Sequence, residues 1–221
     1  MSLVVALLGA ESTGKTTIAQ RLVDILAAQG RQVALVGEYL REFCDQHQRT
    51  PRQDEQQQIA DEQMRRIAHA AATHDIVIAD TTALMIAVYS DTVFGDAGLY
   101  ARAEAAHREH CDLTLLTALD LPWQADGLQR DGPHVRAPVD ARVRASLARA
   151  GIGYGIVFGS GEARVSAALA SVRRALAPPA EREPFLGGAG WHWHCERCGD
   201  AACELHARLP NAGIRGENDP P

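Results

Sequence analysis

An eight-residue segment near the N-terminus carries the residue types of a phosphate-binding loop. Residues 9–16 read GAESTGKT and match the pattern G-x-x-x-x-G-K-[ST] between an apolar run and a helical stretch. Glycines let backbone N–H groups turn toward phosphate oxygens, and the start of the next helix adds partial positive charge. We therefore predict ATP binding, with Lys15 at the β- and γ-phosphates and the Thr16 hydroxyl on Mg²⁺. The expected nucleotide-binding residues are Gly9, Ala10, Glu11, Ser12, Thr13, Gly14, Lys15, Thr16 and Thr17.

A carboxylate follows a second apolar run. Asp80 ends the segment Ile76–Ala79, which has the composition of a buried strand. At the carboxyl end of such a strand, Asp80 would face the phosphate loop and help to hold Mg²⁺. The alternative is that Asp80 caps a helix that begins near Thr82.

A second carboxylate is placed to serve a phosphoryl acceptor. Glu38 follows the apolar run Val33–Val36 and Gly37, and ligands of open α/β sheets bind beyond the carboxyl ends of the strands. Glu38 would then take the proton of an acceptor hydroxyl, and Tyr39 and Arg41 would contact the acceptor. The alternative is an exposed glutamate at a helix start, beside a buried aromatic residue.

The segment Leu121–Pro138 has the composition of a lid over an active site. It is a long polar loop with a tryptophan and two arginines. Such a loop would exclude water and bring guanidinium groups to the transferred phosphoryl group. A surface loop with a half-buried tryptophan is the alternative. The expected substrate-binding residues are Trp123 and Asp126, and the expected catalytic arginines are Arg130 and Arg136.

Short apolar runs separated by helical stretches predict the elements that position these residues. Buried parallel strands have this near-continuous apolar character, so the chain is predicted to be an α/β protein of the P-loop NTPase type. Its core would be a doubly wound, parallel, five-stranded sheet flanked by helices. The expected strands are Leu3–Leu8, Val33–Val36, Ile76–Ala79, Leu113–Leu116 and Tyr154–Phe158. The expected helices are Thr16–Gln29, Gln56–Thr73, one from near Thr82, Leu99–His110, Ala141–Ala150 and Glu162–Leu176.

The C-terminal part differs in composition. We expect a domain over residues 1–177, a Pro/Gly-rich linker over 178–190 and a Cys/His-rich tail over 191–221 that ends in a disordered stretch. The tail spacing C-x2-C-x4-C-x2-H suits tetrahedral Zn²⁺, and reduced thiols on a flexible tail are the alternative. Such a tail would offer a surface for an oligomer or a protein partner. The expected zinc ligands are Cys195, Cys198, Cys203 and His206.

Overall composition excludes several classes of function. The 221 residues carry a formal net charge of −6, which disfavours non-specific binding to nucleic acid or to an anionic membrane. The apolar run Leu3–Leu8 is too short to span a bilayer and has no basic residue before it. We therefore expect a cytoplasmic protein without a disulfide framework.

These motifs together resemble a known family. The segments LLGAESTGKTT, GEYLREF, DIVIADTTALMIAVYSDTVFGD and LDLPWQADGLQRDGPHVR occur in this order. They are similar to the ribosylnicotinamide kinase domain of NadR and to its stand-alone relatives among P-loop ATPases of the AAA family. The resemblance extends over residues 3–176. The family pattern has an arginine directly after D-G-L, where this chain has Gln129, with Arg130 one position later.

The resemblance implies ATP-dependent phosphorylation of the 5′-hydroxyl of nicotinamide riboside. It also implies that Glu38 and Tyr39 lie near the riboside, that Asp80 lies at the metal and that residues 123–127 help to enclose the substrates. The chain contains no H-x-G-H signature, so adenylyl transfer is not expected. A regulatory ATPase switch that acts on a protein partner and a kinase of another nucleoside remain open alternatives.

Overall fold

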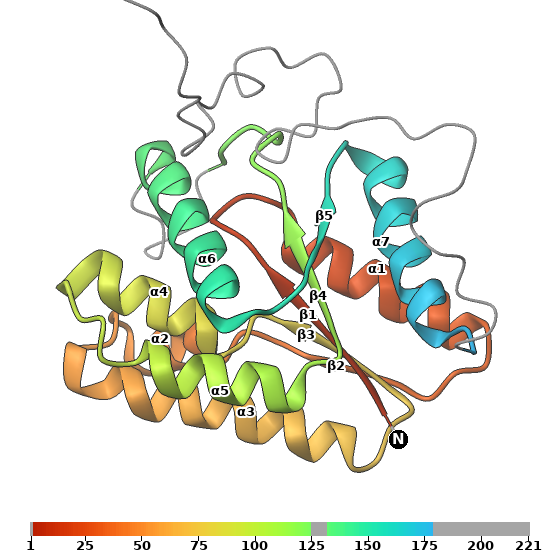
Figure 1. The fold of residues 1–221 in the computed structure, drawn as a ribbon, viewed down its shortest axis with the longest axis horizontal. Coiled ribbons are helices and arrows are strands. Elements are labelled where there is room, and N and C mark those ends of the chain that lie inside the picture. The colour runs from red at the N-terminus through yellow and green to blue at the C-terminus, as the bar shows by residue number, and fades with distance from the viewer. Residues whose placement is uncertain (1, 125–131, 179–221) are drawn as a thin grey trace, which may run out of the picture.

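The computed structural model describes residues 2–124 and 132–178 and has one sheet of five parallel strands at its centre. The strand order is β2-β3-β1-β4-β5 (Figure 1), so the predicted doubly wound α/β fold is confirmed. The strands are β1 (Leu3–Leu8), β2 (Val33–Val36), β3 (Ile76–Asp80), β4 (Leu113–Thr117) and β5 (Gly155–Val157).

Strand β1 is the middle strand and pairs with β3 on one side and β4 on the other. Val5 pairs with Ile78 of β3, and Leu7 pairs with Leu115 of β4. All of these side chains are fully buried, because helices cover both faces of the sheet. A strand buried on both faces needs apolar residues at every position, which is why its sequence shows no alternation.

Helices form a layer on each side of the sheet (Figure 1). They are α1 (Lys15–Ala28), α2 (Tyr39–His47), α3 (Gln56–Ala71), α4 (Ala83–Phe94), α5 (Tyr100–His110), α6 (Arg136–Ala150) and α7 (Gly161–Leu176). Short 3-10 turns lie at Gln53–Glu55 and Pro133–Val135. Helices α1 and α7 pack on one face through Leu22, Leu26 and Val172. Helices α3 to α6 cover the other face.

The expected strands match the observed ones closely, but helix α2 was not among the expected helices, and the loop after β4 needs a correction. The interval Leu121–Pro138 was expected to be a loop throughout, but α6 begins at Arg136. Pro138 lies in the first turn of this helix, where a backbone N–H has no intrahelical partner and proline is tolerated. Reading Pro138 as the end of a loop was therefore wrong.

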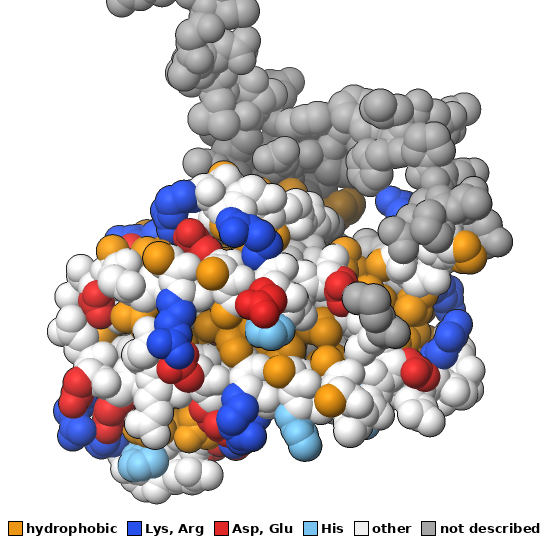
Figure 2. Space-filling view, turned by 60° about the horizontal axis from the view of Figure 1, so that its bottom comes forward, with side chains coloured by type: hydrophobic (Ala, Val, Ile, Leu, Met, Phe, Trp, Pro, Cys, Tyr) orange, Lys and Arg blue, Asp and Glu red, His pale blue; other side chains and the backbone are white. Residues whose placement is uncertain are grey.

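The outer face of the α3–α6 layer carries charges of both signs. Figure 2 shows Lys/Arg and Asp/Glu side chains interspersed on this face, with apolar side chains between them. Several are neighbours that pair along a helix, such as Glu62 with Arg65 and Arg66. Among the described residues, no helix has the length and apolar content needed to cross a bilayer.

Candidate active site

The phosphate loop connects β1 to α1 in a conformation that requires its glycines. Gly9 has φ +144° and Gly14, which caps α1, has φ +81°. A Cβ atom on Gly9 would lie 2.1 Å from Thr117 Oγ1, inside the contact distance of any pair of heavy atoms. The loop therefore needs a residue without a side chain at this point, where it passes closest to β4.

Buried hydroxyl groups hold the loop against the sheet. The Thr13 hydroxyl donates to the Ala10 carbonyl at 2.7 Å. Thr117 Oγ1, at the carboxyl end of β4, lies 3.0 Å from the Leu8 carbonyl and 2.7 Å from Thr13 Oγ1. Thr13 and Thr117 are both fully buried, so these bonds are shielded from water and fix the loop shape before any ligand arrives.

Arg164 of α7 supports the loop from below and was not predicted as a site residue. Its Nη2 donates to the carbonyls of Thr13 at 3.0 Å and Ala118 at 3.1 Å. Its Nη1 donates to Asp120 Oδ1 at 2.6 Å and to the Gly159 carbonyl at 2.7 Å. Arg164 is 3% exposed, and one guanidinium thus joins the phosphate loop to the ends of β4 and β5.

Lys15 and Thr16, at the start of α1, point toward the inside of the loop. Lys15 Nζ donates to the carbonyls of Gly9 at 2.9 Å and Ala10 at 3.0 Å. The Thr16 hydroxyl donates to Asp80 Oδ2 at 2.6 Å. The structure therefore brings together Lys15, Thr16 and Asp80, which the sequence motifs predicted as one site.

The surroundings of Asp80 fit a divalent cation. Asp80 is 3% exposed, and burial raises the pKa of its carboxyl group, while Lys15 and the Thr16 hydroxyl act in the opposite direction. Its Oδ1 is buried without a hydrogen-bond partner among the described residues. A buried carboxylate oxygen with no partner, next to a threonine hydroxyl, is a donor set that suits Mg²⁺.

Glu38 lies between β2 and α2, at the N-cap position of the helix that begins at Tyr39, and its side chain makes no capping hydrogen bond. Its Oε2 accepts a hydrogen bond from Arg41 Nε at 2.9 Å, and its side chain is 14% exposed. Both side chains line the same cleft as the phosphate loop. The acceptor-side residues Glu38 and Arg41 thus share one cavity with Lys15.

That cleft has a volume of about 1070 Å³, large enough for a nucleotide and a second small molecule. From the phosphate loop it is lined by Glu11, Ser12, Thr13, Gly14, Lys15, Thr16 and Thr17. The other lining residues are Glu38, Leu40, Arg41, Cys44, Thr50, Pro51, Arg52, Gln53, Gln56, Tyr89, Val93, Phe94, Leu121, Pro122 and Gln124.

Three of these residues form an apolar wall that was not predicted. Tyr89, Val93 and Phe94 lie on the last two turns of α4, and Val93 and Phe94 are 55% and 38% exposed. The segment AVYSDTVF belongs to the motifs that carry the family resemblance, which assigns no role to its aromatic side chains. No local sequence signal identifies them, because α4 is apolar along most of its length and only the fold shows that its last turns face the cleft.

Tyr39 lies beside the cleft and is not among its lining residues. Its ring packs against the hydrophobic core and is covered by the Arg66 guanidinium, which lies 4.4 Å from the ring centroid. Arg66 is held there by ion pairs with Glu42 and Glu62. Contact between Tyr39 and an acceptor therefore stays a prediction.

Neither Arg136 nor Trp123 is fully exposed, as residues of an open lid would be. Arg136 is 8% exposed, and its guanidinium donates to the carbonyls of Leu121 at 2.8 Å and Leu119 at 3.3 Å. It therefore holds the beginning of the loop in place. Trp123 is half-buried, and Gln124 beside it exchanges hydrogen bonds with Ser12: the Ser12 hydroxyl donates to its carbonyl and accepts from its N–H.

Other expected site residues lie outside the described residues. Asp126 and Arg130 belong to the segment 125–131, and the four expected zinc ligands, the linker and the tail belong to 179–221. Within residues 2–124 and 132–178, no group of three His, Cys, Asp or Glu side chains could hold a metal ion. The zinc site and the partner surface of the tail remain predictions.

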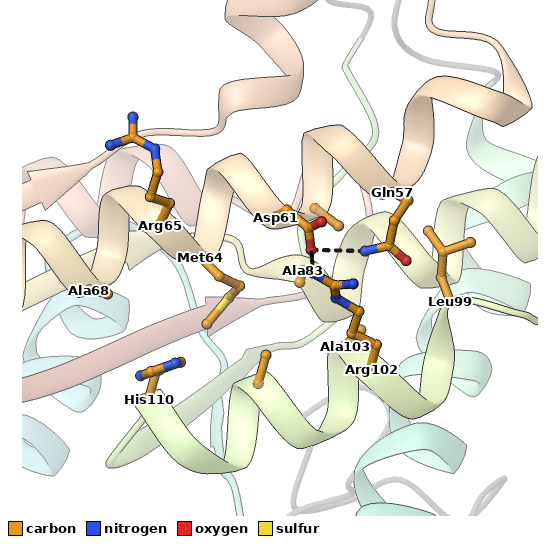
Figure 3. A pocket seen from close by; sticks show the side chains of 12 residues that line it. Gln57, Asp61, Met64, Arg65, Ala68, Ala83, Leu99, Arg102, Ala103 and His110 are labelled. Atoms are coloured by element: carbon orange, nitrogen blue, oxygen red, sulfur yellow. Dashed lines mark hydrogen bonds and ion pairs between the residues drawn. The ribbon is translucent and has the colours of Figure 1, made fainter.

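A second, smaller hollow of about 260 Å³ lies between α3 and α5 (Figure 3). Asp61 stands at its edge, where it accepts from Gln57 Nε2 and pairs with Arg102, both at 2.9 Å. Its floor is formed by small and apolar side chains such as Met64 and Ala103. It contains no residue of the phosphate loop, so the cleft is the candidate active site.

The phosphate loop, the parallel sheet and the cleft at the carboxyl ends of its strands define a P-loop NTPase fold. A family model described as an AAA domain matches residues 4–164, and the chain belongs to this family. No curated protein matches the chain.

Solved structures share the fold at low sequence identity. NadR protein in complex with NAD and AMP-PNP is 20% identical, with a TM-score of 0.61, over 86% of this chain and 52% of that one. NadR in complex with NR is 21% identical, with a TM-score of 0.62, over 79% of this chain and 51% of that one. Thymidylate kinase from Ehrlichia chaffeensis is 15% identical, with a TM-score of 0.54, over 80% of this chain and 99% of that one.

This chain spans about half the length of the NadR chains that it matches. The resemblance to NadR-like P-loop proteins, predicted from the sequence motifs, is confirmed at the level of the fold.

Proposed function

We propose that this chain is a kinase that transfers the γ-phosphoryl group of Mg-ATP to the 5′-hydroxyl of a nucleoside. Nicotinamide riboside, which would give nicotinamide mononucleotide, is the first candidate acceptor. The observation that carries the proposal is the position of Glu38. A carboxylate that can accept a proton lines the same cleft as the phosphate loop and stands at its acceptor-side wall.

The donor end of the cleft provides what a nucleoside triphosphate needs. The glycine-rich turn and the N-terminus of α1 suit the phosphates, and Lys15 is long enough to leave the loop carbonyls and reach the β- and γ-phosphates. Thr16 and Asp80 would hold Mg²⁺, which neutralises phosphate charge when bound.

The transfer itself requires little covalent chemistry from the protein. The acceptor oxygen attacks the γ-phosphorus in line with the leaving oxygen, and the bond from that phosphorus to the β-γ bridging oxygen breaks. The hydroxyl proton passes to Glu38, and the products are ADP and the nucleoside monophosphate. Positioning and charge stabilisation by Lys15 lower the barrier.

The acceptor end favours a nucleoside over an acceptor that already carries a phosphate. Its two arginines are already paired with carboxylates, Arg41 with Glu38, and Arg52 with Asp54 and Glu55. The flat faces of Tyr89 and Phe94 suit an aromatic base. The fold shared with NadR in complex with NR supports nicotinamide riboside within this class.

The test compares two glutamates of the same region, Glu38 and Glu42. Purified protein with Mg-ATP is offered a panel of nucleosides and nucleoside monophosphates, and product mass and ADP release are measured. We expect phosphorylated nicotinamide riboside. Glu38→Gln should lower kcat by about 100- to 1,000-fold without changing the Kd for ATP. Glu42→Gln, which breaks the pair with Arg66 outside the cleft, should stay within about threefold of wild type.

Each alternative gives a different result. Slow ADP release that no nucleoside changes would indicate the regulatory ATPase switch. Selective turnover of another nucleoside would keep the kinase and replace its acceptor. A kcat that Glu38→Gln leaves unchanged would remove Glu38 from the mechanism.

A further inference from the structure

Helix α3 buries two glutamines, Gln56 and Gln63, among apolar side chains, and Gln63 is the more deeply buried of the two. Gln63 is 0% exposed, and its neighbours on the same face of the helix, Ile59 and Ile67, belong to the hydrophobic core. A buried amide is stable only where its oxygen and nitrogen find partners. The partners of Gln63 lie on two other segments, and both segments end at the candidate active site.

The first segment is the turn that carries Glu38. Gln63 Oε1 accepts a hydrogen bond from the Tyr39 N–H at 2.8 Å, and Gln63 Nε2 donates to the Gly37 carbonyl at 3.2 Å. Gly37 and Tyr39 are the residues on either side of Glu38. One amide group thus holds the backbone on both sides of the carboxylate.

The second segment follows Asp80. Gln63 Nε2 also lies 3.4 Å from the Thr81 carbonyl, and the Thr81 N–H donates to the Leu7 carbonyl at 3.1 Å. Thr81 has φ +85°, which is rare and costly for a β-branched residue, and its buried hydroxyl has no partner among the described residues. The backbone after Asp80 therefore keeps an unfavourable conformation that bonds from β1 and α3 hold.

We propose that Gln63 is a positioning residue that fixes Glu38 relative to Asp80. It touches neither substrate. It acts by tying the turn after β2 to the turn after β3, so that the proton acceptor and the metal-side carboxylate keep one separation. The catalytic part of this inference rests on the proposed kinase function, because it assigns the proton to Glu38.

The experiment compares Gln63→Met, which keeps the side-chain length and loses every hydrogen bond, with Gln63→Glu, which keeps an oxygen for the Tyr39 N–H. Gln58→Met is the matched control, because Gln58 lies on the same helix and is exposed. We expect Gln63→Met to lower kcat by about 10- to 100-fold, with KM for ATP within twofold of wild type. Gln58→Met should leave both unchanged.

A double-mutant cycle separates positioning from a general loss of structure. In a Glu38→Gln background the same Gln63→Met change should cost less than about threefold in kcat, because the group that it positions is already gone. An equal loss in both backgrounds would overturn the proposal. If Gln63→Met does not fold, Gln63→Leu, which also lacks every polar atom of the side chain, takes its place in the cycle with the same two outcomes.

A readout without any acceptor keeps this inference separate from the proposed function. Hydrogen exchange of the Tyr39 amide should speed up at least tenfold in Gln63→Met and remain near wild type in Gln63→Glu. An unchanged exchange rate of the Tyr39 amide in Gln63→Met would overturn the proposal that Gln63 holds this turn. If wild-type protein phosphorylates no nucleoside, the kinase proposal fails while these exchange rates still decide whether Gln63 ties the two turns.

Discussion

The two ends of the cleft are built in different ways. The donor end is one continuous segment, the phosphate loop and the start of α1, of which residues 11–17 line the cleft. Its Thr16 contacts Asp80 of the neighbouring strand β3, and its backbone N–H groups would do most of the binding. The acceptor end is assembled from side chains of α2, the stretch 50–56 and the end of α4. A phosphate group has the same shape in every nucleotide, so one backbone cradle serves it. An acceptor varies, so its site is made of side chains that can be exchanged without changing the fold.

The largest expected effect falls on the donor end. Asp80→Asn keeps the size of the side chain and removes the charge, and turnover should fall by about 1,000-fold because metal-assisted charge neutralisation is lost. The free energy of unfolding of the ligand-free protein should rise, since burial raises the pKa of Asp80 and so disfavours its charged form. Activity assays and urea unfolding measure the two effects. Asp24→Asn, on the exposed side of α1, is the control, and a stability loss in Asp80→Asn would contradict the prediction.

A smaller and more selective effect is expected at the acceptor end. Phe94→Ala removes an aromatic face from the cleft and should raise KM for the nucleoside about tenfold, with KM for ATP unchanged. Steady-state kinetics with each substrate varied in turn measure both constants. Leu35→Ala is a matched control, because Leu35 is also 38% exposed but does not line the cleft. An equal rise in both KM values would mean that the two ends are not separable.

The smallest effect on activity is expected from a substitution of His107, which supports helix α4 through Thr82. Helix α4 runs from Ala83 to Phe94. Its N-cap residue Thr82 lies two positions after Asp80, and the Thr82 hydroxyl is bonded to His107, which also contacts Thr114. Burial lowers the pKa of His107 to about 4, against an ordinary value of 6.5. Between these values the unfolded chain binds a proton that the folded protein does not, so stability falls as pH drops below 6.5.

Over pH 7 to 4.5 this histidine should therefore cost wild-type protein roughly 2–3 kcal/mol of its free energy of unfolding. His107→Gln should lose that part of the pH dependence and keep turnover at pH 7 within about threefold, whereas His69→Gln, at an exposed site on α3, should change neither. Denaturant unfolding at several pH values measures the difference. If the free energy of unfolding falls by the same amount in wild type and in His107→Gln as the pH is lowered, His107 does not cause the loss of stability in acid.

Local sequence predicted the strands and the place of the phosphate loop between β1 and α1, because each depends on short-range chemistry. Apolar runs such as Leu3–Leu8 report burial on both faces, and the loop 9–16 carries its own glycines, lysine and threonine. The acceptor end was only partly foreseen. The catalytic role of Glu38, inferred from its place after a strand, stays a prediction. Phe94 was not predicted, since nothing in its neighbourhood shows which way the end of α4 faces.

Arg136 and Gln63 are two further residues whose surroundings could not be predicted from the local sequence. The arginine was expected to be a catalytic lid residue, and it is buried against the carbonyls of Leu119 and Leu121. The glutamine was one of several on α3, yet it alone reaches the turns beside Glu38 and Asp80. Each outcome depends on which distant backbone groups lie within hydrogen-bond reach, and that distance is not encoded in local spacing.

The amino-acid sequence by itself determined the parallel α/β architecture and the phosphate loop, because residue type and local periodicity are sufficient for both. Only the tertiary structure decided the acceptor end and the buried supports, such as the hydrogen bonds that join Gln63 to Tyr39 and Thr81. The physical reason is that hydrogen bonds and burial act over a few ångströms in space, and the fold alone determines which remote residues come that close.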